Sequence, residues 1–226
     1  MERYCHLRGD GDGCAVRCRV LSLGRIAGVS VNMQLTLAAS NRKKDDVIYR
    51  ALIDTVLRKT SSGGAYAPVA LPASQKIVAG GTGMTKAKLI AAKAMFRRNE
   101  CDEQNGEELY MTYNADMLTQ ILSDTTLTSA DFMAVKMLQE GAVSSKWLGF
   151  NWLAYEKLDS ADDAGTITKT AAAWCKSAVH FGTGAEYSVD IGPRRDKNNT
   201  IQISVDASYG AGRANESKVV AIDFIA

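Results

Sequence analysis

The spacing of apolar residues changes repeatedly along the chain, and this change between two periods constrains the fold more than any other feature. Over residues 29–37 every second residue is apolar, which is the period of a strand that buries one face. Over residues 45–60 the apolar residues instead recur every three or four positions, which is the period of an amphipathic helix. We therefore predict a strand at 29–37 and a helix at 45–60.

The same two periods continue downstream. Further helices are predicted at about 86–98, 115–122, 129–141 and 169–181, and strands or extended segments at 69–78, 109–113, 186–191, 200–207 and 217–225. Helices and strands are mixed without a regular strand–helix–strand repeat, and neighbouring strands often follow one another directly. This order predicts the α+β class.

Composition narrows the function classes. A chain of 226 residues with 46% apolar residues buries enough surface to fold without a disulfide or metal staple. The net charge of +2 is not that of a dedicated nucleic-acid binder. The longest apolar runs have four or five residues, whereas a membrane span needs about 20, so we expect no membrane partner. Five irregularly placed cysteines and no export signal predict reduced thiols.

A glycine-rich loop precedes one predicted helix. Residues Gly80–Lys86 follow a predicted strand and contain three glycines, a combination that can cradle phosphate with backbone N–H groups. A nucleoside triphosphate loop requires Gly-Lys-Ser/Thr, and a dinucleotide fingerprint requires a glycine where Lys86 stands. We therefore prefer a flexible turn with Thr85 as the helix N-cap. A small cytosolic enzyme that binds a phosphate or nucleotide at this loop is the alternative.

Residues for catalysis and metal binding are scarce. Cys14 and Cys18 have a loosely zinc-like spacing, but Cys5 and His6 are adjacent and cannot form a second zinc knuckle. His180 is the second of two histidines, and no Gly-x-Ser-x-Gly nucleophile motif occurs. We predict no catalytic residue, no cofactor and no metal site, and therefore no enzyme.

Basic residues form small clusters at 42–44, 97–98 and 194–197. Such clusters are usually solvated surface, although inward-facing ones in a shell would attract nucleic acid through its phosphates. A second alternative is a nucleic-acid-binding module that uses residues 1–44 as a basic arm.

An apolar block surrounds Gly149. The residues from Trp147 to Leu153 are mostly aromatic or aliphatic, which is too apolar for a free surface loop, and we predict that they lie in the core. Gly149 is expected to provide a positive φ or a close backbone approach that a Cβ would oppose.

From residue 45 onward the order of features resembles a tailed-phage major capsid protein of the Hong Kong 97 type, in the divergent branch of phage capsid proteins. The resemblance rests on the combination of Tyr110–Asn114, Ser129–Phe132 leading to Gly141, Trp147–Phe150, Gly210–Arg213 and Val219–Ile222. It covers about four-fifths of the chain and begins after residue 44.

This resemblance implies a Hong Kong 97-like fold with two domains. A peripheral domain is expected over 45–105, with its spine helix at about 85–98 and β strands beside it. An axial domain with a mixed sheet and flanking helices is expected over 106–212, and 213–226 would return as a strand to the peripheral domain. Residues 1–44 are assigned to an N-terminal arm or to the remnant of an extended loop.

The resemblance also implies a function. Such a protein self-assembles through hexamers and pentamers into the icosahedral shell that encloses phage double-stranded DNA. It is expected in the virion, and in the host cytoplasm during assembly. Expected partners are further copies of itself, scaffold, portal or decoration proteins, and packaged DNA held by nonspecific electrostatics. The scarcity of catalytic residues agrees with a structural role.

Overall fold

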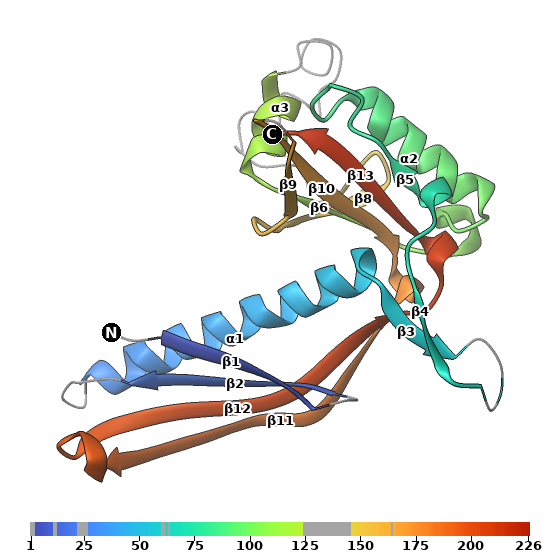
Figure 1. The fold of residues 1–226 in the computed structure, drawn as a ribbon. Coiled ribbons are helices and arrows are strands. Elements are labelled where there is room, and N and C mark those ends of the chain that lie inside the picture. The colour runs from blue at the N-terminus through green and yellow to red at the C-terminus, as the bar shows by residue number, and fades with distance from the viewer. Residues whose placement is uncertain are drawn as a thin grey trace. The chain divides into compact units, whose positions relative to one another are not determined.

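The computed structural model describes residues 3–10, 13–21, 27–59, 62, 64–123, 146–163 and 165–226, and side chains are not described before residue 33. The chain divides into two compact units, each made from two stretches. Unit 1 contains Met1–Ile48 and Phe181–Gly212, and unit 2 contains Tyr49–His180 and Arg213–Ala226 (Figure 1).

Unit 1 combines a four-stranded sheet with a long helix. Its elements are β1 (Arg3–Asp10), β2 (Gly13–Leu21), α1 (Ala27–Ile53), β11 (Val179–Arg194) and β12 (Thr200–Arg213). The strand order is β1-β2-β12-β11, with β1–β2 and β2–β12 antiparallel (Figure 1). The first and last parts of this unit thus meet in one sheet.

Tyr209 of β12 joins the sheet to α1. Its ring is buried and packs against Val47 and Ala207, and its hydroxyl donates to the carbonyl of Ser40 at 3.5 Å. The ammonium of Lys44 lies 5.9 Å from the centre of the same ring. This aromatic contact fixes α1 against the strand.

The predicted strand at 29–37 is wrong, because α1 runs without a break through these residues. The alternating apolar residues do not form one helical stripe. Instead Thr36 and Ser40, four positions apart, are buried, while Leu35 and Leu37 are 43% and 37% exposed. A helix nucleated in the well-patterned part near residue 47 can extend into a poorly patterned one, since propagation costs little.

Other local predictions at this end need correction as well. The helix predicted at 45–60 ends at Ile53, and Val56–Lys59 form β3 instead. Residues 1–25, which show no sustained period, contain the hairpin of β1 and β2.

Unit 2 is built on a mixed sheet in the order β5-β13-β10-β6-β8-β7, with β9 also paired to β10. Its strands are β3 (Val56–Lys59), β4 (Tyr66–Val69), β5 (Lys76–Ile77), β6 (Leu109–Tyr113), β7 (Lys146–Trp147), β8 (Phe150–Ala154), β9 (Asp159–Asp163), β10 (Thr166–Cys175) and β13 (Val219–Ile225). Its helices are α2 (Lys86–Arg98) and α3 (Ala115–Ser123). Short 3-10 helices lie at Ala73–Gln75, Glu103–Asn105, Lys176–Ala178 and Glu216–Lys218 in this unit and at Arg195–Lys197 in unit 1. The β5–β13 and β6–β8 pairs are parallel and the other registered pairs antiparallel, so the predicted α+β class is confirmed.

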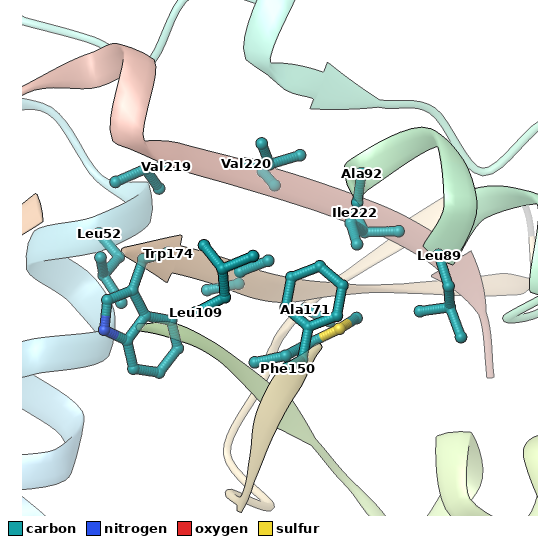
Figure 2. Packing of buried hydrophobic residues seen from close by; sticks show 14 of the residues in the cluster. Leu52, Leu89, Ala92, Leu109, Phe150, Ala171, Trp174, Val219, Val220 and Ile222 are labelled. Atoms are coloured by element: carbon teal, nitrogen blue, oxygen red, sulfur yellow. The ribbon is translucent and has the colours of Figure 1, made fainter. Parts of the chain in front are cut away.

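The core of unit 2 lies between its sheet and α2. Helix α2 buries Leu89, Ala92 and Phe96, and the Phe96 ring meets that of Phe150 edge-on with centroids 6.0 Å apart. Figure 2 shows Leu89 and Ala92 beside Ile222 of β13. Because β13 is covered on both faces, it is a continuous apolar run rather than an alternating one.

The predicted helix at 169–181 is wrong. These residues form the end of β10, a short 3-10 helix and the start of β11, and His180 therefore lies in a strand. Alanines 171–173 have high helix propensity, which explains the error. In the structure they are fully buried in a central strand between β13 and β6, where small side chains allow close packing on both faces.

Several predictions hold. Helix α2 and strand β6 lie where expected, and α3 begins after Asn114, whose side-chain oxygen accepts the Met117 N–H at 3.0 Å as a cap. Residues 159–163, a polar run, form β9. The helix predicted at 129–141 lies outside the described residues.

The boundaries between the two compact units lie at 48/49, 180/181 and 212/213. The expected boundary at 212/213 coincides with the end of unit 1, but the one at 105/106 falls inside unit 2. Helix α2 and strands β6, β8 and β10 all contribute buried residues to one apolar cluster.

Candidate functional site

The glycine-rich loop before α2 is held by a buried lysine that the sequence analysis did not single out. The Lys88 ammonium donates hydrogen bonds to the carbonyls of Ala79, Thr82 and Gly83 at 2.8, 2.9 and 2.9 Å. A fourth carbonyl, that of Asp223 in β13, lies at 3.1 Å. Burial lowers the pKa of Lys88, and the nearby Asp223 carboxylate opposes that shift.

This arrangement is the reverse of a phosphate cradle. A phosphate requires converging N–H donors, whereas the loop turns three carbonyl oxygens toward one ammonium group. Lys86, the residue proposed for a phosphate contact, is exposed and takes no part. The three carbonyls that converge here therefore suit a cation, the Lys88 ammonium, and not a phosphate.

The loop is also attached to its neighbours. The Met84 N–H donates to Oε1 of Gln120 at 2.6 Å, and Nε2 of Gln120 donates to the Ile225 carbonyl at 2.8 Å. A Cβ on Gly83 would lie 2.6 Å from that Oε1, so a larger residue here would displace the end of the Gln120 side chain from these hydrogen bonds. Thr85 occupies the predicted N-cap position, but its side chain makes no capping hydrogen bond.

The sequence contained a signal for Lys88. The residues that α2 buries, Lys88, Leu89, Ala92 and Phe96, follow the helical period, and Lys88 is the charged member of that inner face. A lysine at an inward position requires a compensating acceptor, and the preceding loop is the nearest source of free carbonyls.

The outward side of α2 forms a groove with an apolar floor. It is lined by Leu89, Ile90, Lys93, Ala94, Arg97, Asp102 and Leu148. Ile90 is 51% exposed, and Arg97 pairs with Asp102 at 2.9 Å. The Lys93 ammonium lies 5.6 Å from the centre of the Phe150 ring. We name this surface, together with the exposed Lys86 one turn before Ile90, the α2 groove.

A tight turn places Leu148 in the groove. Trp147 and Phe150 are opposite each other in the β7–β8 hairpin, and the two residues between them have φ of 52° and 79°. Two positive φ values are typical of the hairpin turn that matches strand twist. The expected positive φ at Gly149 is thus confirmed, and Trp147, Phe150 and Trp152 are buried as predicted. Leu153, however, is 45% exposed.

The β9–β10 hairpin is acidic and exposed. Asp162 and Asp163 lie on the surface, and Asp162 accepts the Gly165 N–H at 3.0 Å, which shapes the turn. Ile167, at the start of β10, is 48% exposed. Figure 1 shows β9 beside β10 in unit 2, away from α2. We name Asp162, Asp163 and Ile167 the β9 tip.

A second buried cation fixes the point where the chain re-enters unit 2. Arg213 is 3% exposed, and its guanidinium donates to the carbonyls of Leu52, Asp54 and Val69 at 2.7, 3.0 and 3.0 Å. Leu52 lies in the last turn of α1 and Asp54 directly follows the helix, where a cation is favoured by the helix dipole. Burial lowers the pKa of Arg213.

The remaining chemistry-bearing groups are structural. Burial raises the pKa of the Cys175 thiol to about 12, and this thiol donates to the Cys101 carbonyl at 3.0 Å, so it is not a reactive thiolate. Among the described residues, no group of three His, Cys, Asp or Glu side chains could hold a metal ion. Within the same residues, no helix is long and apolar enough to cross a membrane.

The fold is shared with capsids. The capsid of Ralstonia phage GP4 matches with a TM-score of 0.65 at 13% identity, covering 98% of this chain and 81% of that one. A chain from Mycobacterium phage Che8 matches with a TM-score of 0.61 at 16% identity, covering 95% and 76%. The SrpI encapsulin complex from Synechococcus elongatus matches with a TM-score of 0.54 at 11% identity, covering 98% and 81%. No curated protein sequence matches.

A family model gives the family itself. The model described as phage capsid protein matches residues 26–226, which includes α1 and every later element. The resemblance drawn from the sequence, the α+β capsid fold and the capsid function are thereby confirmed. The chain belongs to the family of phage capsid proteins and has the function of a major capsid protein.

Proposed function

We propose that copies of this chain assemble through head-to-tail contacts into hexamers and pentamers, and that these rings close into an icosahedral shell around double-stranded DNA. The observation that carries the proposal is the family match over residues 26–226, together with a fold shared with phage capsids. Head-to-tail contacts generate closed rings when the rotation between neighbours closes.

We assign unit 1 to the peripheral domain and unit 2 to the axial domain. The family resemblance implies a long spine helix, and α1 has 27 residues, about 40 Å at 1.5 Å per residue, whereas α2 has 13. We therefore propose α1 rather than residues 85–98 as the spine helix. The β1–β2 hairpin would be the remnant of the extended loop.

Exposed apolar residues support association. Leu57 and Tyr66 are 70% and 64% exposed on the β3–β4 hairpin, a two-stranded sheet that pairs with no other described strand. A lone two-stranded hairpin is marginally stable in water. Contact with a neighbouring copy would remove this apolar surface from solvent and support the hairpin.

The other partners follow from the same role. Packaged DNA would be held by nonspecific attraction of its phosphates to basic residues, and scaffold, portal or decoration proteins would bind the assembled shell. The protein would be found in the virion, and in the host cytoplasm during assembly. We infer a purely structural role without an enzymatic step, since Lys88 already fills the loop proposed for phosphate.

Expression of the full chain, followed by size-exclusion chromatography and negative-stain microscopy, tests the proposal. The expected result is rings or closed particles that elute far ahead of a 24.3 kDa monomer. A protein that stays monomeric at high concentration, including after co-expression with phage assembly partners, contradicts the proposal. Saturable nucleotide binding that Lys86→Ala abolishes would support the enzyme alternative instead.

A further inference from the structure

We propose that the α2 groove of one copy receives the β9 tip of a second copy, so that these two surfaces form a head-to-tail contact between neighbouring subunits in a ring. This inference rests on the proposed function, because it identifies which surfaces of unit 2 meet when the rings form. Both surfaces lie in unit 2, on different elements of one fold.

The receiving surface is basic at both ends and apolar in the middle. Lys86, Ile90, Lys93 and Arg97 recur every three or four positions and so share one side of α2. Helix α2 contains no acidic residue. Ile90 and Ala94, with Leu148 from the β7–β8 turn, form the apolar floor.

The inserted surface has the opposite charge and a matching apolar residue. Asp162 and Asp163 are exposed and have no ion-pair partner among the described residues, and Ile167, which is 48% exposed, lies opposite Asp162 in the β9–β10 register. Strand β9 is also an edge strand, since β10 is its one described partner. It combines an open edge, two negative charges and one large apolar side chain.

Charge and polarity together favour a second copy over DNA as the occupant. Phosphates would be attracted by the lysines and arginines, but they would meet an apolar floor and the carboxylate of Asp102 within the groove. The β9 tip offers aspartates for the basic ends and an isoleucine for the floor. Opposite charges on the two partners also guide the encounter and fix its orientation.

A charge exchange tests this contact in the full chain. The first variant carries Lys86→Glu and Lys93→Glu, and the second carries Asp162→Lys and Asp163→Lys. Each alone places like charges at the contact, so ring dissociation constants measured by analytical ultracentrifugation should rise about tenfold or more. Thermal melts of each variant check that unit 2 remains folded. The matched control, Lys76→Glu with Lys157→Glu, reverses two exposed lysines elsewhere on unit 2 and should assemble like the wild type.

Mixing the two exchanged variants gives the sharpest result. Each contact in an alternating ring again joins opposite charges, so assembly should return, and negative-stain images should show even-membered rings without pentamers. A chain with all four substitutions should also assemble.

Three results overturn the proposal. The first is unchanged assembly when either variant is tested alone, the second is a mixture of the two variants that does not assemble, and the third is an equal loss of assembly in the control variant. A wild-type chain that forms no rings, including after co-expression with phage assembly partners, overturns the proposed function and this contact together. Wild-type rings combined with any of the three results overturn the contact alone.

Discussion

Unit 2 and unit 1 are stabilised in different ways. Unit 2 has one apolar cluster that reaches from α2 through the whole mixed sheet, with Phe96, Phe150 and Phe224 fully buried. In unit 1, among the side chains that the structure describes, the buried apolar residues are Ile203, Val205 and Tyr209, all on β12. A long helix on a long ribbon of strands buries little surface by itself. We infer that unit 2 is stable alone and that unit 1 gains stability from neighbouring copies.

The largest expected effect tests that contrast directly. Phe96→Ala removes a fully buried ring that packs on Phe150, and we expect unit 2 to lose about 3–5 kcal/mol of unfolding free energy. Ile203→Ala in unit 1 is the matched change, at a residue that is also fully buried. Urea unfolding of the unassembled chain, followed by tryptophan fluorescence, reports on unit 2 in both variants, because all three tryptophans lie there, so Ile203→Ala should change this signal less than Phe96→Ala. A larger loss of tryptophan-monitored stability for Ile203→Ala than for Phe96→Ala would contradict the comparison.

The contrast also explains which elements could be predicted from the sequence. In unit 2, α2, β6 and α3 have periods that match their surroundings, and Asn114 caps α3 as its residue type suggests. The failure there is β10, whose alanines favour a helix in isolation. Strand β10 becomes a central strand because it pairs with β13 and β6, which are remote from it in sequence.

In unit 1 the pattern itself was misleading. The alternation at 29–37 suggests a strand, but α1 faces too little core for burial to enforce a helical stripe.

The contacts of Lys88 in unit 2 were missed for another reason. The acceptors of Lys88 are backbone carbonyls, and the residue types do not show where these carbonyls point. The basic and apolar residues of α2 that line the α2 groove can be identified in the sequence. Leu148 is remote from them in sequence and lies beside them only because of the fold.

The second prediction concerns a substitution that removes a buried cation and leaves the apolar cluster of unit 2 intact. Lys88→Met would leave the carbonyls of Ala79, Thr82 and Gly83 without their donor, and we expect a loss of about 3 kcal/mol in urea unfolding. Lys86→Ala, at an exposed first-turn position where a positive charge opposes the helix dipole, should be nearly neutral. Equal losses in the two variants would contradict the role assigned to Lys88.

A third prediction concerns the turn that carries Leu148. Gly149 has a φ of 79°, where a β-branched residue is strained, so Gly149→Val should lower the unfolding free energy by about 1–3 kcal/mol. Gly149→Asn is the control, since asparagine tolerates the left-handed region better than valine. A higher melting temperature for Gly149→Val than for Gly149→Asn would show that the turn does not need a positive φ at this position.

The smallest expected effect is a pH dependence at the surface of unit 2. The Glu107 carboxylate accepts hydrogen bonds from Lys218 at 2.7 Å and from Ser177, and these bonds lower the pKa of Glu107 below its ordinary value of 4.5. A carboxylate with a lowered folded-state pKa stabilises the protein above its unfolded-state pKa, and this contribution disappears as the pH falls through the folded-state value. Wild type and Glu107→Gln should therefore differ in urea unfolding at pH 6, and the difference should shrink as the pH falls below 4.5 and disappear below the folded-state pKa. The difference is small because the pair is partly exposed and solvent screens it.

The control is Glu100→Gln. Glu100 is an exposed carboxylate without an ion pair among the described residues, so this variant should show no such convergence with the wild type. A gap between wild type and Glu107→Gln that stays constant from pH 6 to pH 3 would mean that the variant acts through packing and not through the charge of Glu107.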